Sequence, residues 1–366
     1  MRLNVSNYWK YQSVAADISS EIISGVQVEL LEPGAEAEWN GYVDDHLLGS
    51  SAHLVEWKGL IEHVFGKKTY YLVARSEGRI VGVLPLVHMH SLLFGNFMVS
   101  VPYLNYGGIL ADDTVVEQRL MAEAASLAKG LAAKSIEYRE QVEKISDMPC
   151  RTDKVSMILQ LPASEAELSK QLGSKLRSQI KRPLRENPEV SIGKMECLND
   201  FYEVFARNMR DLGTPVYGKY FFKEILRAFH GAYIVTIKLQ GRPVAAAFLL
   251  GYRNTLEIPW ASTIRDVNHL SMNMLLYWEV LCSAIAKKYE RFDFGRSTVD
   301  AGTYRFKKQW GAEPKQLYWR YEIFEGGNMP GLTTSNPKFR LAIQVWQRMP
   351  VILTKYLGPL VVKHLP

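Results

Sequence analysis

One order of secondary-structure patterns runs along this chain twice, and this repeat restricts the fold more than any other feature. Each copy contains a strand, two helices, a hairpin, a further strand, a long helix and a short strand. The first copy is predicted as strand 26–32, helices 35–48 and 54–65, hairpin strands 70–75 and 79–87, strand 106–110, helix 114–133 and strands 135–139 and 154–161. The second is predicted as strand 189–195, helices 198–212 and 220–229, hairpin 232–250, strand 255–261, helix 271–288 and strands 291–294 and 317–324. We therefore expect an α+β chain with two mixed sheets.

Composition and chain breaks divide the sequence into two domains and a tail. Its 366 residues, 47% hydrophobic and 22% charged, suit two folded domains. Residues 162–184 are predicted as a helix between the copies, and Pro183 and Pro188 close it. After Phe324 the sequence changes to Gly-Gly-Asn-Met-Pro and Thr-Thr-Ser-Asn-Pro, followed by a basic amphipathic stretch. We expect domains at 1–162 and 163–325 and a tail at 326–366.

The net charge of +6 is concentrated in two segments. The tail has five cations and no acidic residue: Lys338, Arg340, Arg348, Lys355 and Lys363. Residues 168–185 have six cations and no acidic residue: Lys170, Lys175, Arg177, Lys181, Arg182 and Arg185. We expect anionic partners at these two segments. The tail suits an anionic membrane surface, and the alternative is that its apolar residues pack onto the body of the protein.

Several functional classes have no support in the sequence. Residues 1–24 lack the apolar core of a signal peptide, and no stretch reaches the roughly 18 apolar residues of a membrane span. The three cysteines, Cys150, Cys197 and Cys282, are far apart and are expected to be reduced. Nucleotide-binding, zinc-protease and serine-hydrolase motifs are absent, and the pair His88 and His90 is better explained as a surface or core pair than as a metal site. We expect a cytoplasmic monomer without a metal.

The segment 291–311, R-F-D-F-G-R-S-T-V-D-A-G-T-Y-R-F-K-K-Q-W-G, is the most unusual in the chain. A short strand ends at Gly295, and Thr303 is predicted to cap a helix in which Phe306 and Trp310 share one face. Cations gather beside this turn, at Arg296, Arg305, Lys307 and Lys308, a setting that favours an anion or a developing oxyanion. The alternative is an amphipathic surface helix with solvated lysines.

The run D-F-G followed by Y-x-F-K-K-x-W-G resembles the FemAB aminoacyltransferases, in which the Phe-Lys pair lies at the transfer site. Further motifs resemble the exopolysaccharide-associated (PEP-CTERM/exosortase) branch of that family. They are His53-x-x-x-Trp57, Phe65-Gly66, the runs at 78–87 and 93–96, Tyr106-Gly107-Gly108, M-R-D-L-G-T-P-V at 209–216, Tyr277-Trp278-Glu279, and N-P-K-F-R and L-G-P-L in the tail. The resemblance covers nearly the whole chain and implies two tandem GNAT-like (acyl-CoA N-acyltransferase-like) domains.

It also implies an acyltransferase that moves an aminoacyl or acyl group onto an amine or hydroxyl of an envelope polysaccharide or peptidoglycan-like precursor. Phe306 and Lys307 become the catalytic candidates, with Lys307 stabilising an oxyanion or the terminal ribose of the donor. The substrate-binding candidates are Trp57, Tyr106, Arg177, Lys181, Arg182, Tyr217, Trp278, Arg296, Tyr304 and Arg305. For Trp57 and Trp278 the alternative is a place in the core.

No cofactor is expected to be tightly bound, and the donor is either aminoacyl-tRNA or acyl-CoA. Residues 263–270, T-I-R-D-V-N-H-L, lack the glycine-rich loop on which GNAT enzymes hold the pyrophosphate of acyl-CoA. The expected partners are this donor, a sugar or lipid-linked precursor, tRNA through the basic helix, and an anionic membrane at the inner face of the cytoplasmic membrane through the tail. The alternative function is a non-catalytic scaffold that binds a precursor in polysaccharide export.

Overall fold

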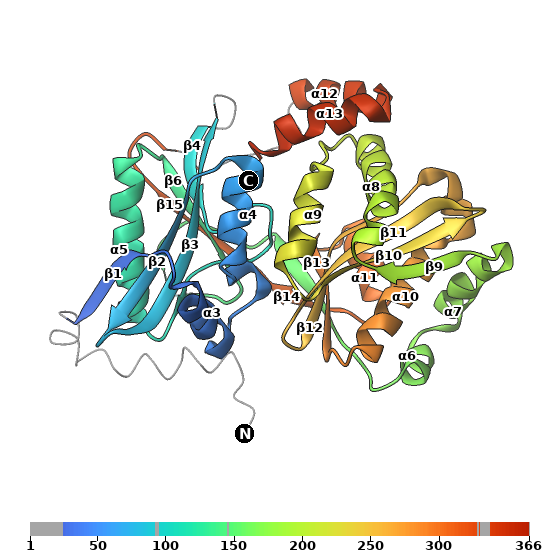
Figure 1. Ribbon diagram of the computed structural model, residues 1–366, viewed down its shortest axis with the longest axis horizontal. Coiled ribbons are helices and arrows are strands. Elements are labelled where there is room, and N and C mark those ends of the chain that lie inside the picture. Colours follow the sequence, from blue (N-terminus) through green and yellow to red (C-terminus); the bar gives the residue numbers. More distant parts are fainter. Residues whose placement is uncertain (1–24, 92–94, 145, 328, 330–336, 366) are drawn as a thin grey trace. The chain divides into compact units, whose positions relative to one another are not determined.

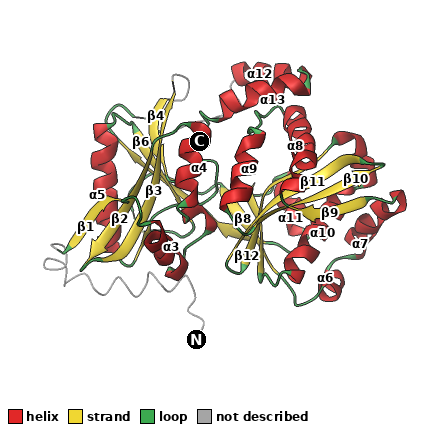
Figure 2. Ribbon diagram, in the orientation of Figure 1, coloured by secondary structure: helices red, strands yellow, loops and turns green. Residues whose placement is uncertain are grey.

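The computed structural model describes residues 25–91, 95–144, 146–327, 329 and 337–365. The segment in which no signal peptide was expected, residues 1–24, lies outside these ranges, as do parts of the motifs at 93–96 and 336–340. Among the described residues the chain divides into two compact units. The first consists of residues up to 150 together with 318–329, and the second of 151–317 and 330–365. Both units are α+β, as Figure 2 shows.

The first unit is built on a sheet of eight strands in which β5 pairs only with β3 and the others follow the order β1-β2-β3-β4-β6-β15-β7. The strands are β1 (Val26–Leu30), β2 (Thr69–Ser76), β3 (Arg79–Ser91), β4 (Gly95–Val99), β5 (Leu110–Ala111), β6 (Ser135–Glu140), β7 (Cys150–Arg151) and β15 (Tyr318–Ile323). Its helices are α3 (Glu36–Asp45), the 3-10 turn η2 (Ser51–His53), α4 (Glu56–Phe65) and α5 (Thr114–Gly130). Figure 1 shows α5 on one face of the sheet and α3 and α4 on the other.

The core of the first unit forms where α5 covers the sheet. Val116, Leu120 and Ala124 lie on one face of this helix and are buried against the strands. The helix begins where predicted because the Asp113 carboxylate accepts a hydrogen bond from Val116 N at 2.8 Å. Strand β4, which the sequence analysis did not predict, lies between β3 and β6, whereas the predicted strand 106–110 contributes only its last residue to β5.

The second unit is built on a seven-stranded sheet with the order β14-β8-β13-β12-β11-β10-β9. The strands are β8 (Lys154–Gln160), β9 (Glu189–Gly193), β10 (Ala232–Leu239), β11 (Arg242–Tyr252), β12 (Thr255–Thr263), β13 (Arg291–Thr298) and β14 (Glu313–Gln316). The helices are α6 (Glu165–Gln171), α7 (Ser174–Lys181), α8 (Leu198–Leu212), α9 (Lys219–Ala228), α10 (Met272–Ala286), α11 (Gly302–Lys308), α12 (Pro337–Arg348) and α13 (Val351–Val362), with 3-10 turns η3 (Arg182–Glu186), η4 (Met195–Cys197) and η5 (Arg265–Leu270). In Figure 1, α8 and α9 cover one face of this sheet and α10 covers the other.

Aromatic side chains form the core beneath α8 and α9. The rings of Phe201 and Phe205 on α8 meet Phe222 on α9 at centroid distances of 4.9 and 5.1 Å, and Phe248 of β11 completes the cluster. Such edge-on contacts add to the free energy of burial. Helix α8 ends as predicted at Gly213, whose φ of +78° is the left-handed conformation that closes a helix.

The last strand of each sequence repeat belongs to the sheet of the other repeat. Strand β8, expected to close the first copy, pairs with β13 and β14 in the second sheet. Strand β15, expected to close the second copy, pairs with β6 in the first sheet. Each unit therefore includes one strand from beyond the boundaries expected at 162 and 325.

Buried charges hold β15 in the first sheet. Arg320 donates to Glu117 on α5 at 2.8 Å and to Glu140 on β6 at 3.1 Å, and these side chains are 4–9% exposed. Lys144 approaches the same two carboxylates at 3.1 and 3.5 Å. Each buried charge has a partner of opposite sign, which offsets the cost of removing it from water.

The basic segment between the copies was expected to form one helix. It forms two short helices and a 3-10 turn instead. Helix α6 ends at Gln171, Gly173 precedes α7, and η3 follows through Pro183. Helix α7 packs against α10 with its apolar side chains Leu176 and Ile180 buried.

The tail packs on the second unit, where α12 and α13 contact α8. Arg210 of α8 donates to Met349 O at 3.0 Å, and Gln347 donates to Asp211 O at 3.2 Å. Gly358 allows the closest approach, because a β-carbon there would lie 2.7 Å from the backbone of Val216. No helix within the described ranges has the length and apolar character required to cross a membrane.

Candidate functional site

Strands β12 and β13 run parallel and separate towards their carboxyl ends. They pair only from Thr255 with Arg291 to Glu257 with Asp293, although β12 continues to Thr263 and β13 to Thr298. On its other edge, β13 shifts register against β8 between Asp293 and Arg296. Separation of parallel strands leaves an opening at their carboxyl ends, which is where ligands bind in many α/β sheets.

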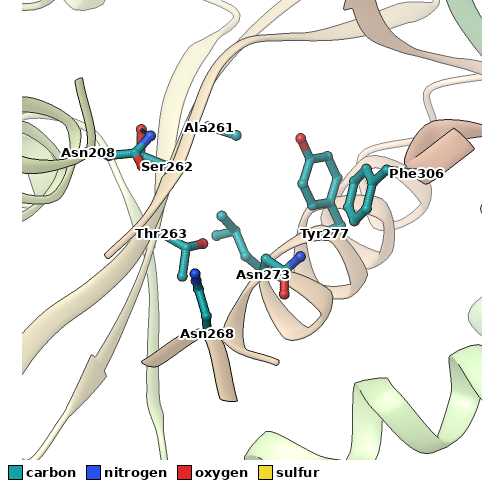
Figure 3. A pocket seen from close by; sticks show the side chains of 9 residues that line it. Asn208, Ala261, Ser262, Thr263, Asn268, Asn273, Tyr277 and Phe306 are labelled. Carbon is teal, nitrogen blue, oxygen red and sulfur yellow. Dashed lines mark hydrogen bonds between the residues drawn. The ribbon is translucent and has the colours of Figure 1, made fainter. Parts of the chain in front are cut away.

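A pocket of about 400 Å³ lies at this end of β12. Its lining comes from α8, β12, η5, α10 and α11, and consists of Asn208, Ala261, Ser262, Thr263, Asn268, Asn273, Leu276, Tyr277 and Phe306. Figure 3 shows these side chains facing the same space. None of the nine is charged, and six of them are polar, so the lining favours a neutral ligand with several hydrogen-bonding groups.

Tyr277 and Phe306 form the aromatic wall of the pocket. Their rings meet edge to face at 4.9 Å, as Figure 3 shows, and Tyr277 also contacts Phe294 at 5.7 Å and Trp310 at 6.1 Å. The predicted common face of Phe306 and Trp310 is therefore confirmed. Burial raises the pKa of Tyr277 to about 12, so the hydroxyl is protonated at neutral pH and can donate a hydrogen bond. Among the described residues nothing bonds to this hydroxyl.

Neutral polar side chains form the opposite side of the pocket. Asn208 of α8 donates to Ser262 Oγ at 3.1 Å, which fixes the orientation of its amide. Asn268 lies on η5, Asn273 lies in the first turn of α10, and Thr263 is the last residue of β12 (Figure 3). Each of these groups can both donate and accept hydrogen bonds. Such groups can bind amides or hydroxyls of a ligand without requiring a charge.

Lys307 points into the fold and does not line the pocket. Its Nζ donates to Gly295 O and to Arg296 O, each at 2.9 Å, and the residue is 8% exposed. Lys307 lies in the last turn of α11 and is not solvated, unlike the lysines of the alternative surface helix. Lys307 ties the end of that helix to the irregular part of β13, and its neighbour Phe306 faces the pocket.

Asp293 is the acidic group beside Lys307. Its carboxylate accepts hydrogen bonds from Ser156 Oγ and Gly295 N, both at 2.7 Å, and it is 3% exposed. Burial lowers the pKa of Lys307 to about 8, with the nearby charge of Arg296 acting in the same direction and that of Asp293 opposing it. Lys307 therefore loses its proton at a lower pH than an ordinary lysine.

The other cations of the segment lie outside the pocket lining. Arg296 and Arg305 are exposed, and Arg305 donates to Asp300 O at 3.0 Å. Tyr304 lies under Lys308 at 5.9 Å. Thr303 does not cap α11, as had been expected: the cap residue is Ala301, and Thr303 lies within the first turn.

Of the three substrate-binding candidates in the basic segment, Arg177 has a structural role and the other two are exposed. Arg177 donates to Ser169 O at 3.2 Å and to Leu172 O at 2.7 Å, carbonyls at the end of α6. A cation in this position satisfies carbonyls that the helix leaves unpaired. Lys181 and Arg182 are exposed, and their role in binding an anionic substrate stays a prediction.

Four predicted aromatic contacts are divided between the units. Trp57 and Tyr106 are buried in the first unit, and the Trp57 indole donates to Ser51 O at 2.8 Å, which agrees with the alternative that Trp57 is a core residue. Tyr217 and Trp278 are half-buried in the second unit. Tyr217 contacts Trp260 at 6.0 Å. Roles in substrate binding stay predictions for all four.

Five polar residues of the pocket were absent from the predicted site: Asn208, Ser262, Thr263, Asn268 and Asn273. They come from four separate elements, so no local motif connects them. Tyr277 could have been found, because it belongs to the Tyr-Trp-Glu motif and precedes the candidate Trp278.

The comparisons with known proteins agree with the architecture. Residues 174–308 match a family model described as an acetyltransferase (GNAT) domain. All nine residues of the pocket lie within the matched segment. No curated protein matches the sequence.

Solved structures with the same fold cover both units. FemX is 15% identical, with a TM-score of 0.60 over 87% of this chain and 100% of FemX. L-PGS from Bacillus licheniformis is 14% identical, with a TM-score of 0.54 over 88% of this chain and 99% of that one. A tandem GNAT protein from the clavulanic acid biosynthesis pathway is 14% identical, with a TM-score of 0.52 over 83% of this chain and 99% of that one. The predicted fold of two tandem GNAT-like domains is confirmed.

Proposed function

We propose that the pocket of the second unit is the site of an acyl or aminoacyl transfer. The observation that carries this proposal is that every residue of the pocket lies in the segment that matches a GNAT acetyltransferase domain. The uncharged, hydrogen-bonding lining suits the neutral ester or thioester end of an activated donor. The donor is acyl-CoA or aminoacyl-tRNA.

In the proposed reaction, an amine or hydroxyl of the acceptor attacks the carbonyl carbon of the donor. A carbon–nitrogen or carbon–oxygen bond forms, the bond to the donor's sulfur or ribose oxygen breaks, and the acceptor's proton passes to the leaving group or to water. The neutral Tyr277 hydroxyl is the group best placed to donate a hydrogen bond to the carbonyl oxygen as it becomes negative. Asn208 and Asn273 would orient the substrates on the other side of the pocket.

Lys307 takes a positioning role in this proposal, in place of direct contact with the oxyanion. Its two hydrogen bonds to β13 hold the last turn of α11, and thereby hold Phe306 against Tyr277. Loss of Lys307 would lower the transfer rate by displacing the aromatic wall. Phe306 forms part of the pocket wall and supports the orientation of the Tyr277 ring.

We further propose that the acceptor is an envelope polysaccharide or a peptidoglycan-like precursor, handled in the cytoplasm in connection with exopolysaccharide and PEP-CTERM systems. The motifs shared with that branch of the FemAB family support this assignment. Exposed Lys181 and Arg182 would bind the diphosphate of a lipid-linked or nucleotide-linked acceptor. The alternative is a scaffold that binds the same precursor without catalysis. The cellular role of a scaffold should not depend on the Tyr277 hydroxyl.

Mass spectrometry of polysaccharides and lipid-linked intermediates tests the proposal. Cells that lack the gene should lose one acylated or aminoacylated species, and the wild-type gene should restore it. Tyr277→Phe should leave at most about 1% of that restoration, since a single oxyanion donor is worth about 100-fold in rate. Tyr71→Phe is the matched control, because the Tyr71 hydroxyl is buried in the first unit without a hydrogen-bond partner among the described residues. Full restoration by Tyr277→Phe would favour the scaffold.

A binding measurement with purified protein separates the two donors. The melting temperature should rise in the presence of either coenzyme A or aminoacyl-tRNA, whichever the pocket binds. Ala261→Phe should abolish the rise by filling the pocket, because Ala261 lies in the lining. A rise that persists in Ala261→Phe would locate donor binding elsewhere.

A further inference from the structure

Helix α13 is apolar on both of its faces. Thr354, Gly358 and Val362 form the buried face that packs towards α8. The opposite face carries a continuous exposed stripe of large apolar side chains: Ile352, Leu353, Tyr356, Leu357, Leu360 and Val361. Ile352 is 79% exposed and Tyr356 is 75% exposed. A helix that is apolar all round is stable only where both faces are covered.

Helix α12, which like α13 contacts α8, also has exposed apolar side chains. Ile343 faces inward, since a β-carbon at Gly213 would lie 2.5 Å from its side chain. Leu341 and Val345 are 65% and 55% exposed. Arg340 and Arg348 are also exposed, and no acidic residue occurs anywhere between 326 and 366. The surface therefore combines apolar side chains with charge of one sign.

Two lysines of α13 lie at the border of the apolar stripe. Lys355 is half-buried, with its ammonium 5.5 Å from the ring of Tyr202, and Lys363 follows at the end of the helix. The Lys355 ammonium is thus directed towards α8, and the exposed cations among the described residues of the two helices are Arg340 and Arg348. In Figure 1 both helices lie next to α8, which each of them contacts.

We infer that α12 and α13 form a docking surface for an anionic lipid membrane. The exposed apolar side chains would enter the boundary between headgroups and acyl chains, and the cations would bind the lipid phosphates. At about 1.5 Å per residue, each twelve-residue helix is far shorter than the roughly 30 Å hydrocarbon core. The helices therefore lie in the membrane surface and do not cross it.

Charge distinguishes a membrane from a second copy of the chain as the occupant. Two copies that met through this surface would bring the exposed Arg340 and Arg348 of both copies into one interface. No acidic residue of the tail would be available to neutralise them, so the contact would be repulsive. An anionic lipid surface complements both the apolar stripe and the cations. This inference does not depend on the proposed transfer reaction.

Flotation of the full chain with lipid vesicles tests the inference. We expect binding to vesicles of phosphatidylcholine containing about 30% phosphatidylglycerol and little binding to phosphatidylcholine alone. Salt at about 1 M should release the protein, since it shortens the screening length to about 3 Å. Binding that is equal on both vesicles, or absent from both, would overturn the inference.

Matched substitutions locate the surface. Ile352→Ser combined with Tyr356→Ser should reduce binding at least tenfold, whereas Leu30→Ser with Leu47→Ser, equally apolar and about 50% exposed in the first unit, should not. Arg340→Gln with Arg348→Gln should reduce binding by about fivefold per charge. The control pair Arg79→Gln and Arg227→Gln removes two exposed arginines elsewhere.

Melting temperatures and gel filtration complete the test. All of these side chains are exposed, so each variant should melt within a few degrees of the wild type. Unchanged flotation of the Ile352→Ser and Tyr356→Ser variant would overturn the inference. A wild-type dimer that this variant converts to monomer would instead assign the surface to a second copy of the chain.

Discussion

The parallel strand pairs of the two units differ in what lies beyond the point where they separate. In the first unit, β4 and β6 pair only from Met98 with Ile136 to Val99 with Glu137. In the second unit, β12 and β13 pair over three residue pairs, and a pocket follows. Both sheets have the same plan, with a long helix between the two parallel strands. The difference is therefore one of side chains and loops and not of topology.

In the first unit, the loop that follows β4 occupies the space beyond the point where β4 and β6 separate. Gly108 N donates to Arg139 O at 3.0 Å, and Arg139 N donates to Ser100 Oγ at 2.8 Å, so the loop after β4 closes onto β6. The guanidinium of Arg139 donates to Leu104 O at 2.5 Å and lies 4.3 Å from the ring of Trp319. The second unit has uncharged side chains at the edge of an open space instead. The loop after β4 thus occupies this interval in the first unit, whereas a pocket lies at the corresponding place in the second.

The largest effect is expected when the buried contacts of Arg139, which fill this space in the first unit, are removed. Arg139→Met should lower the free energy of unfolding by about 3–5 kcal/mol, because it leaves Glu137, which is 5% exposed, without its partner at 2.7 Å. Arg75→Met is the control: Arg75 pairs with Glu29 and Glu38 near the surface, and should cost about 1 kcal/mol or less. Urea unfolding followed by circular dichroism measures both. Similar losses for the two variants would contradict the contrast between the buried and surface arginines.

The next effect concerns the pH dependence of Lys307 beside the open interval. Its pKa is lowered to about 8 in the folded chain, against about 10.4 for an unfolded lysine. Between these values the unfolded chain binds more protons, so the unfolding free energy of the wild type should rise with pH. Relative to Lys307→Met, the wild type should gain up to about 3 kcal/mol between pH 7 and pH 10.

Urea unfolding at several pH values checks this expectation. The burial cost of the charged lysine is fully present below about pH 8 and is relieved as the folded chain loses the proton. Lys308→Met provides the control, since Lys308 is the exposed neighbour on the same helix. A flat difference between wild type and Lys307→Met across this range would show that Lys307 is not buried as a charged group.

The third prediction concerns a substitution that fills the pocket of the second unit, as the loop after β4 fills the corresponding space in the first. Ala261→Phe places a ring in the open interval and should raise KM for the donor by about tenfold or more, since it occupies the pocket. Overpacking should cost about 1–3 kcal/mol of stability. Ala163→Phe, at an exposed position, is the control and should change neither quantity. Unchanged kinetics in Ala261→Phe would separate the pocket from donor binding.

Local sequence patterns predicted the order of elements but not the partners of the final strands. Periodicity indicates that residues near 154–160 and 318–323 are strands, yet it contains no information on which sheet each joins. The choice depends on contacts between residues far apart in sequence, such as Arg320 with Glu117 and Glu140. The stop at Gly213 was predictable because a left-handed residue after a helix is a local requirement.

The site was predictable in its aromatic part and not in its polar part. Phe306 and Trp310 are four residues apart, so helical geometry alone places them on one face. The burial of Lys307 follows from the irregular register of β13, which turns two carbonyls towards α11, and no pattern in the sequence indicates such an irregularity. The asparagines of the pocket meet only through the arrangement of four elements.

The smallest expected effect concerns Arg305, an exposed arginine of the second unit that lies outside the pocket lining. Arg139 in the first unit is buried in its own interval, whereas Arg305 in the second unit is exposed and gives one hydrogen bond to Asp300 O. Arg305→Gln should therefore change the unfolding free energy by no more than about 0.5 kcal/mol.

If Arg305 binds a phosphate of donor or acceptor, KM should rise about fivefold with kcat unchanged, because an exposed charge contributes about 1 kcal/mol to such contacts. Arg227→Gln, which removes another exposed arginine of the same unit, should leave KM unaltered. Steady-state kinetics at low and at high salt decides the matter: the effect of Arg305→Gln should shrink as salt screens the charge. Equal KM values for wild type and Arg305→Gln at low salt would remove Arg305 from substrate binding.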